Sequence, residues 1–531
     1  MTRADLLQSL TAQPLFDLAV VGGGATGLGV ALDAALRGFS VLLLESHDFA
    51  GGTSSRSTKL LHGGVRYLAQ GNIALVREAL AERATVLRIA PHLAQPLRFV
   101  MPSYRWWQTP FYGVGLKLYD LMAGKAGLGR TDFLSREQTL AALPGVNAQQ
   151  LRGGVRYWDG QFDDARLALA LARTAEAAGA RVLNYAAVTV VQQQPGAAAG
   201  SELQFTDTLT GASHRARARC VVNATGVWVD DLRARSGPAD AAPGHAGAPA
   251  RMVSPSQGVH VVVDRDFLPG NHALLVPKTQ DGRVLFAVPW LGKLILGTTD
   301  TPRQDLPREP DAFAAELDFI LGEAGRALGR AVRPEDIRSV WVGLRPLVAP
   351  PDEVQGGTKV LSREHTIVVD PHGMVTVTGG KWTTYRAMAE DVMERCFDAA
   401  LLDRRPGSAS AHHALLGAPP ASVRAVALHE PPGLHLYGTL ATEVLQCPGA
   451  SRELGMGLTE AMVRYAVRAE HAHTVEDVLA RRSRALFLDA AAAADMAPEV
   501  AAILREEGCP APALEAFLDL CRHYRAGTAA K

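Results

Sequence analysis

Three glycines and one glutamate near the start of the chain have the spacing of a dinucleotide-binding turn. Gly22, Gly24 and Gly27 follow the apolar run 18–21, and Glu45 ends the next apolar run. Such glycines let the backbone approach a pyrophosphate, which binds the amides of a helix N-terminus, while the acid accepts hydrogen bonds from a ribose. Strand, turn, helix and strand form a βαβ unit, so a dinucleotide domain is expected to open the chain.

The chain carries one such fingerprint. Enzymes that reduce a bound flavin with NAD(P)H often carry two, so the sequence favours FAD without a nicotinamide partner. The alternative is a glycine-rich turn in an unrelated α/β domain.

The next stretch, 51–68, is dense in hydroxyl groups. Thr53, Ser54, Ser55 and Ser57 are suited to binding phosphate or the edges of a flavin. The alternative is a loop whose hydroxyls only cap a helix.

Two later segments repeat the pattern of a strand that ends in a small-residue turn. One ends in Ala224-Thr225-Gly226, and the other ends in a Gly-Gly turn before a helix that starts at Thr383. Open α/β sheets bind ligands at the carboxyl ends of their strands, so both turns are expected at the same site. The helix N-terminus at Thr383 would favour negative charge on a flavin.

Together these motifs resemble those of a known family. The runs "GGGATGLG", "TSSRSTKLLHGGVRYL", "NATGVWVD", "GTTDTP", "GLRPL" and "TGGKWTTYRAMAED" are similar, in matching order over about 15–400, to the FAD-dependent glycerol-3-phosphate dehydrogenases. That family belongs to the D-amino-acid-oxidase-like flavoproteins. The resemblance implies oxidation of sn-glycerol 3-phosphate to dihydroxyacetone phosphate, with electrons passed from FAD to a membrane quinone, ubiquinone or menaquinone.

The resemblance also implies an α/β fold with an interleaved architecture. A Rossmann-like FAD-binding domain and an antiparallel-sheet substrate domain would precede a helical C-terminal domain. The expected ranges are 15–100, 150–235 and 340–400 for the FAD domain, 101–149 and 236–339 for the substrate domain, and 405–531 for the helical domain.

The motifs and the resemblance predict a set of FAD contacts. These are Gly22, Gly24, Gly27, Glu45, Thr53, Ser54, Ser55, Lys59, His62, Gly63, Gly64, Ala224, Thr225, Gly226, Gly380, Lys381 and Thr383.

The implied substrate is a small dianion, whose pocket needs arginine or lysine. The positions that match the family are Arg66, Arg345, Arg363 and Lys381, with hydroxyl contacts expected from Tyr67 and Thr299. For each arginine alone, a surface or helix-capping ion pair is the alternative.

Hydride transfer from the substrate C2 to the flavin N5 also needs a base for the hydroxyl proton, and a base that works near neutral pH suggests histidine. His260, in "GVHVVVD", is the expected base, and the alternative is a strand histidine satisfied in the core. We assign His62 to flavin contact. Arg345 and Lys381 complete the predicted catalytic set, and Arg345 is expected to polarise the hydroxyl.

The pentapeptide Gly-Gly-Val-Arg-Tyr occurs twice, at 63–67 and at 153–157. The second copy precedes an alanine- and leucine-rich helix for which Asp163 or Asp164 is a suitable N-cap. Arg156 and Tyr157 are therefore predicted to be structural.

Composition excludes several classes of protein. The 54 basic and 54 acidic residues cancel, so nothing attracts the chain to nucleic acid. Five scattered cysteines argue against a disulfide framework or a zinc site, so no metal is predicted, and they suit a reducing cytosol. Neither a signal peptide nor a spanning segment is predicted, and the protein is expected in the cytoplasm.

Two segments suggest surface roles. The aromatic stretch 103–130, with Trp106 and Trp107, suits peripheral contact with the inner face of the cell membrane, and its alternative is a partly buried helix. In the C-terminal part Thr474-x-x-Asp477 resembles a capping box, and a cap or homodimer contact is expected there.

Three other functions fit parts of the sequence. An oxidase of the same substrate would pass electrons to oxygen. An amine oxidase of the wider group would favour one arginine for a carboxylate, and a flavin-binding sensor would show no turnover.

Overall fold

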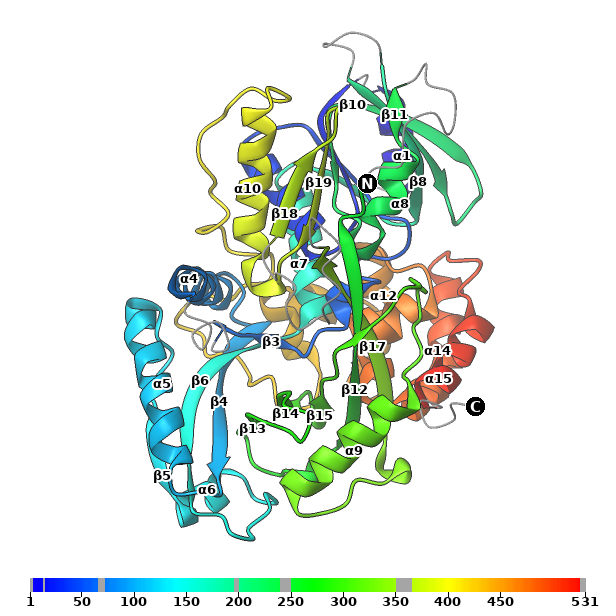
Figure 1. The fold of residues 1–531 in the computed structure, drawn as a ribbon. Helices are drawn as coiled ribbons and strands as arrows, with labels where there is room; N and C mark the ends of the chain where they lie inside the picture. Colours follow the sequence, from blue (N-terminus) through cyan, green and yellow to red (C-terminus); the bar gives the residue numbers. More distant parts are fainter. Residues whose placement is uncertain are drawn as a thin grey trace.

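The computed structural model describes residues 3–12, 15–64, 72–194, 200–238, 250–349 and 365–525. Two large sheets share the chain, one in the upper and one in the lower half of Figure 1, and helices of the C-terminal part lie beside the lower sheet. The predicted α/β class is confirmed. Three predicted substrate contacts, Arg66, Tyr67 and Arg363, lie outside the described residues.

The first sheet has a parallel centre, in the order β19–β10–β1–β2–β7. Its bounds are β1 (Phe16–Val21), β2 (Val41–Leu44), β7 (Arg181–Leu183), β10 (Ser213–Asn223) and β19 (Met374–Gly379). β2 is an unbroken apolar run, buried throughout, because both faces of this sheet are covered.

The two faces of this sheet pack against different layers. Leu18 and Val20 of β1 face a core shared with α2 (Ala25–Leu36), α7 (Asp164–Ala177) and α10 (Tyr385–Asp398). Ala19 and Val21 face a second core on the other side of the sheet. That side comprises α1 (Arg3–Ala12), β8 (Ala186–Gln193), β9 (Ser201–Asp207) and α8 (Val229–Ala234), while β11 (Gly237–Pro238) and β18 (His365–Val369) extend the sheet.

The second sheet is mostly antiparallel. Its strands, in order, are β16 (Thr301–Pro302), β12 (Val253–Asp264), β15 (Lys293–Gly297), β14 (Leu285–Trp290), β13 (Ala273–Val276), β4 (Ala94–Ser103), β6 (Gly153–Phe162) and β3 (Leu60–Leu61), with β17 (Ser339–Val348) beside β12 and β5 (Asp132–Ser135) beside β6. One face packs on α6 (Arg136–Ala142) and α9 (Ala314–Leu328), and the other packs on the C-terminal helices.

Strand pairing follows other bounds than the predicted domain ranges. β3, β6 and most of β4 and β17 fall in ranges predicted for the FAD domain but belong to the second sheet, whereas β11 falls in a substrate-domain range and pairs with β8. The physical reason is long-range pairing: β6 lies against β4 from Ala94 opposite Phe162 to Ser103 opposite Gly153. The interleaving is therefore finer than the motif order indicates.

The C-terminal part is mainly helical and packs on β12 and β17. It contains α11 (Ala441–Gln446), a short hairpin of β20 (Glu453–Gly455) and β21 (Leu458–Thr459), α12 (Glu460–Ala469), the π-helical turn η9 (Asp477–Arg482), α13 (Ala485–Leu488), α14 (Ala490–Glu506) and α15 (Leu514–Arg525). The predicted capping box is present, because Asp477 N donates to Thr474 Oγ1 and Thr474 N donates to Asp477 Oδ2. Two further helices, α4 (Ile73–Ile89) and α5 (Gln108–Ala123), lie at the opposite side of the molecule (Figure 1).

Candidate active site

The predicted dinucleotide residues gather at one edge of the first sheet, since β1, β2, β10 and β19 are parallel and adjacent. Gly22 has a φ of +114°, and a Cβ there would lie 2.5 Å from Ala224 O. A Cβ on Gly27 would overlap with Gly22 O, so this glycine lets α2 pack closely on β1. A Cβ on Gly24 would come within 4 Å only of Ser54 Oγ among the described atoms. The turn thus fits a pyrophosphate at the N-terminus of α2.

Glu45 is held in place at the end of β2. Its Oε2 accepts from Gly23 N at 2.7 Å, and its Oε1 accepts from His47 N at 2.9 Å and from Ser46 Oγ at 3.1 Å. A carboxylate has about four acceptor sites, so capacity remains for a ribose hydroxyl.

The hydroxyl-rich loop forms hydrogen bonds both to β17 of the second sheet and to the helix that follows β1 of the first sheet. The sequence did not indicate these contacts. Thr53 Oγ1 donates to Leu344 O of β17 at 2.6 Å, while Ser54 Oγ accepts from Ala25 N at 2.9 Å and so caps α2. Trp382 Nε1 donates to Ser54 O at 2.8 Å. The hydroxyls of Thr53 and Ser54 therefore position the loop, and the capping alternative holds for Ser54.

Lys59 differs from its predicted role. Its side chain is fully buried beneath the loop, where Nζ donates to Ser55 O at 2.7 Å and to Asp164 Oδ2 at 2.8 Å. Burial lowers the pKa of Lys59 to about 7, partly offset by Asp164. Lys59 thus supports the loop from below rather than presenting its amine at the sheet edge, because the buried carboxylate holds it there.

The segment 62–64 lies beside the turn that follows β19. Thr383 Oγ1 donates to His62 O at 3.5 Å, a long bond, and Gly63 N donates to the buried Asp159 Oδ1 at 3.1 Å. Gly380 has a φ of +70°, which favours glycine, and a Cβ there would displace the Met388 side chain.

The other turns meet the same edge. Thr378 Oγ1 contacts Gly226 O at 3.4 Å, and Thr225 Oγ1 donates to Asn223 Oδ1 at 2.8 Å. Lys381 precedes the short helical turn that leads into α10. The structure therefore brings the predicted residues of β1, β2, β10 and β19 together at one edge.

His260 lies on β12 and is 2 % exposed. Its ring stacks on Trp341 with centroids 5.2 Å apart, and Nε2 lies 2.9 Å from Thr58 Oγ1. Burial, with the cations Lys59 and Arg345, holds the pKa of His260 well below its usual range. Nδ1 is buried and has no hydrogen-bond partner within the described part of the chain. A neutral imidazole in this place is able to accept a proton.

Arg345 lies on β17, the strand next to His260. Its guanidinium donates to Asp300 Oδ1 at 3.1 Å, to Thr298 Oγ1 at 3.2 Å and to Thr299 O at 2.9 Å. This network fixes the guanidinium at the side of β12 that carries His260.

The hydroxyl of Thr299, a predicted substrate contact, forms hydrogen bonds within the protein instead. Its hydroxyl donates to Glu316 Oε1 at 2.8 Å and accepts from Val259 N at 3.0 Å, and the residue is 1 % exposed. The hydroxyl beside Arg345 is that of Thr298. Adjacent threonines point to opposite sides of an extended chain, which the motif alone does not resolve.

Loop 53–59 connects the cofactor edge to the second sheet. Ser54 contacts α2, Thr58 contacts His260, and Thr53 contacts β17. Sequence reasoning missed Thr58, Trp382 and Asp164, whose roles depend on partners far away in the chain. Arg156 and Tyr157 are structural as predicted, since Arg156 pairs with Asp132 at 2.6 Å and Tyr157 stacks on Phe99.

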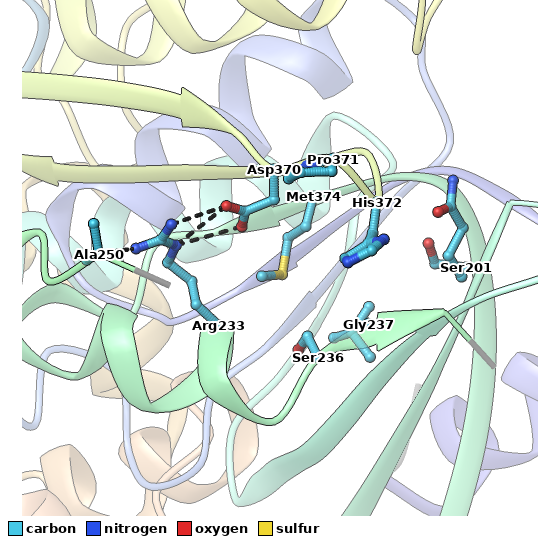
Figure 2. A pocket seen from close by; sticks show the side chains of 11 residues that line it. Ser201, Arg233, Ser236, Gly237, Ala250, Asp370, Pro371, His372 and Met374 are labelled. Atoms are coloured by element: carbon cyan, nitrogen blue, oxygen red, sulfur yellow. Dashed lines mark hydrogen bonds and ion pairs between the residues drawn. The ribbon is translucent and has the colours of Figure 1, made fainter. Parts of the chain in front are cut away.

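A cavity of about 370 Å³ lies elsewhere, beside the β18–β19 turn (Figure 2). Arg233 points to Asp370 there, pairing at 3.0 Å, and also donates to Ala250 O at 2.8 Å. None of the predicted site residues lines this cavity, and its arginine is already neutralised. The cavity is therefore not the predicted active site.

The site and fold define a flavoprotein oxidoreductase, and comparison with known proteins agrees. Residues 17–386 match the FAD dependent oxidoreductase family, and residues 432–508 match the C-terminal domain of alpha-glycerophosphate oxidase. The chain belongs to the FAD-dependent oxidoreductases, so its cofactor is FAD.

Within that family the chain groups with the glycerol-3-phosphate dehydrogenases. It is 39 % identical over 536 residues to the probable mitochondrial glycerol-3-phosphate dehydrogenase of Caenorhabditis elegans, covering 95 % of this chain and 72 % of that one. It is 39 % identical over 524 residues to the mitochondrial glycerol-3-phosphate dehydrogenase of Homo sapiens, covering 93 % and 70 %.

Solved structures show the same fold. The glycerol-3-phosphate dehydrogenase of Bacillus halodurans complexed with FAD has a TM-score of 0.77 and 27 % identity, covering 100 % of this chain and 99 % of that chain. The L-alpha-glycerophosphate oxidase of Mycoplasma pneumoniae, with a TM-score of 0.55 and 17 % identity over 75 % of this chain and 97 % of that one, shares the fold.

Proposed function

We propose that this protein oxidises sn-glycerol 3-phosphate to dihydroxyacetone phosphate. The observation that carries the proposal is the junction at loop 53–59, which joins the dinucleotide edge to a buried neutral histidine and a fixed arginine. The names of the relatives, which are nearly 40 % identical over most of this chain, support the substrate.

Each group then has a chemical task. Gly22, Gly24 and the N-terminus of α2 would hold FAD, which would supply a hydride acceptor for the hydrogen on the substrate C2. His260 would take the proton of the C2 hydroxyl, so that the C2–O bond becomes a carbonyl as the hydride leaves. Arg345, whose guanidinium is fixed on the neighbouring strand, is proposed to polarise the substrate hydroxyl.

Binding of the phosphate is assigned to basic side chains. Arg345 lies on β17 of the second sheet and Lys381 follows β19 of the first. These two side chains, with Arg66 and Arg363, are proposed to bind the phosphate. Several cationic side chains fit a substrate with a doubly charged phosphate better than they fit an amino acid, which carries a single carboxylate.

Anaerobic addition of sn-glycerol 3-phosphate tests this function directly. The visible flavin absorbance of the holoenzyme should bleach, whereas glycine or proline should leave it unchanged. No bleaching by sn-glycerol 3-phosphate would refute the substrate and favour a flavin sensor. A His260→Asn variant that keeps near-full turnover would remove His260 as the base.

We also propose that the reduced flavin passes electrons to ubiquinone or menaquinone at the inner face of the cell membrane. The support is an exposed apolar stripe along and just before α5, formed by Trp106, Trp107, Phe111, Val114, Leu118 and Leu121. Trp106 and Leu121 are 78 % and 77 % exposed, as expected for groups that enter a lipid interface. Among the described residues, no helix combines the length and apolar character needed to cross a bilayer, so the contact would be peripheral.

Liposome co-sedimentation tests the membrane contact. Replacing Trp106 and Trp107 by serine should reduce binding, while Val423→Ser, at an exposed apolar position in another segment, serves as control. Unchanged binding of the tryptophan variant would refute the contact. A comparison of the hydrogen peroxide yield with the rate of quinone reduction distinguishes a dehydrogenase from an oxidase. We also propose a homodimer, which light scattering tests.

A further inference from the structure

One arginine of the C-terminal helical part reaches into the core beneath the hydroxyl-rich loop. Arg484 lies between η9 and α13, is 0 % exposed, and has a left-handed backbone with φ +67°. Its Nη2 donates to Ser55 O at 2.8 Å. The two residues are 429 positions apart in the chain, so this bond ties the C-terminal part directly to the loop.

A closed cluster of charges surrounds that bond. Ser55 O also accepts from Lys59 Nζ at 2.7 Å, and Asp164 pairs with both cations, at 3.2 Å to Arg484 and 2.8 Å to Lys59. Asp164 also accepts from Ser57 Oγ at 2.7 Å. Asp163 also lies 3.7 Å from Arg484 Nε. Since all four charged side chains are 0 % exposed, the loop carbonyl is held by hydrogen bonds that water does not weaken.

The guanidinium itself is rigidly placed. Nη1 donates to Ala480 O at 2.9 Å, and the group stacks on Phe487 with the central carbon 4.1 Å from the ring centroid. The planar fork of arginine makes the bonds to Ala480, Ser55 and Asp164 at once, which a lysine ammonium at this position does not reproduce.

Ser55 is flanked by the residues that form the site. Ser54 caps α2 at the dinucleotide turn, and Thr58 lies against His260 Nε2. A shift of the Ser55 carbonyl would therefore move both the cofactor contact and the partner of the proposed base.

We infer that Arg484 is a positioning residue for FAD and for His260, and that the C-terminal helical part acts on the active site through it. The inference concerning His260 rests on the proposed function. The inference concerning FAD rests on the family alone, so measurements without substrate separate the two.

The test replaces Arg484 by Met and by Lys in the full-length chain. Arg484→Met should raise the dissociation constant of FAD by about tenfold or more, because charged hydrogen bonds to the loop are lost. It should also lower the maximal rate of flavin reduction with little change in KM, and shift the pH profile of that rate. Arg484→Lys, which keeps the charge without the fork, should fall between.

Arg166→Met is the matched control. Arg166 is also buried, at 5 % exposed, and it pairs with Glu470 at 2.8 Å and lies over the Tyr437 ring. It therefore links α7 to the same C-terminal part, with no hydrogen bond to loop 53–59 among the described residues. It should lower the stability to unfolding while leaving FAD affinity within about twofold of the wild type. Equal FAD affinities for the two methionine variants would overturn the inference, as would wild-type FAD binding by Arg484→Met.

Asp164→Asn covers the case in which Arg484→Met fails to fold. This variant weakens the anchor of both cations while keeping the shape of the side chain. It should raise the dissociation constant of FAD in the same direction. Unchanged FAD affinity in Asp164→Asn would overturn the inference. In another outcome, FAD affinity changes in the variants while sn-glycerol 3-phosphate fails to reduce the flavin of the wild type and of every variant. That result would support the positioning of FAD by Arg484 and refute the proposed substrate.

Discussion

Alanine substitutions at two glycines of the dinucleotide turn should differ in their effect on stability, although both should weaken FAD binding. At Gly27 a Cβ would overlap with Gly22 O, a backbone atom that moves only if α2 separates from β1. We expect Gly27→Ala to lower the free energy of unfolding of the apoprotein by about 3 kcal/mol or more. At Gly24, where φ is −85°, a Cβ would meet only Ser54 Oγ, at 3.0 Å.

Gly24→Ala should therefore change apoprotein stability by no more than about 1 kcal/mol, since reduced freedom of the unfolded chain offsets the displacement of Ser54. The methyl would still obstruct the close approach of a pyrophosphate to α2. A misfit of about 1.4–3 kcal/mol corresponds to a roughly 10- to 100-fold rise in the dissociation constant of FAD.

Urea unfolding of the apoproteins and flavin fluorescence titrations measure the two quantities separately. The contrast matters more than either value, because Gly27→Ala should lose both stability and FAD affinity. Wild-type FAD affinity in Gly24→Ala would refute the placement of the pyrophosphate at this turn. Equal destabilisation of the two apoproteins would refute the packing argument.

Three further outcomes follow from buried groups. Burial lowers the pKa of His260 below its ordinary 6.5, so His260 should stay neutral as the pH falls through 6.5. The rate of flavin reduction should therefore stay constant in that range and decrease only at lower pH. A decrease centred at or above pH 6.5 that disappears in a His260 variant would contradict this. Gly63→Ala should impair FAD binding, because a Cβ would overlap with the Tyr119 hydroxyl and lie 2.5 Å from Leu80 Cδ2. Adding Tyr119→Phe removes only the first of these clashes and should restore part of the affinity; an additive double variant would argue otherwise. Asp48→Asn should lower the free energy of unfolding by about 3–5 kcal/mol in urea titrations, because it leaves Arg481 and Arg482 buried without their shared carboxylate, and a loss below about 1 kcal/mol would count against that pairing.

The dinucleotide edge could be predicted from the sequence because its determinants are local. An apolar run, a glycine turn and a helix specify a βαβ unit within about 30 residues. The carboxyl ends of parallel strands then share one edge, so the turns after β10 and β19 join it without further information. Gly22, Glu45 and Ala224 accordingly lie where the motifs place them.

The buried charged residues beneath loop 53–59 could not be predicted from the sequence, because their positions depend on partners far away in the chain. Lys59 stands next to flavin-binding residues in the sequence, but its position is decided by Asp164, which is 105 residues away. Arg484 belongs to a run, Arg-Arg-Ser-Arg, that looks like a solvated charge cluster. Three arginines of that run are buried against carboxylates from the N-terminal half, and no local pattern indicates such partners.

The repeated pentapeptide shows why an identical string need not mean an identical task. Leu60 and Leu61, just before the first copy, pair with Gln161 and Gly160, just after the second, so the two segments lie side by side in the second sheet. Asp159, two residues after the second copy, accepts a hydrogen bond from Gly63 N in the first copy and is held by Arg83 at 2.9 Å. Asp159, in the segment that follows the second copy, therefore holds the backbone of Gly63, the first residue of the first copy. The role of each copy is thus decided by its neighbours in the fold: residues 153–157 are paired within the second sheet, whereas Gly63 is bonded to a carboxylate from the neighbouring strand.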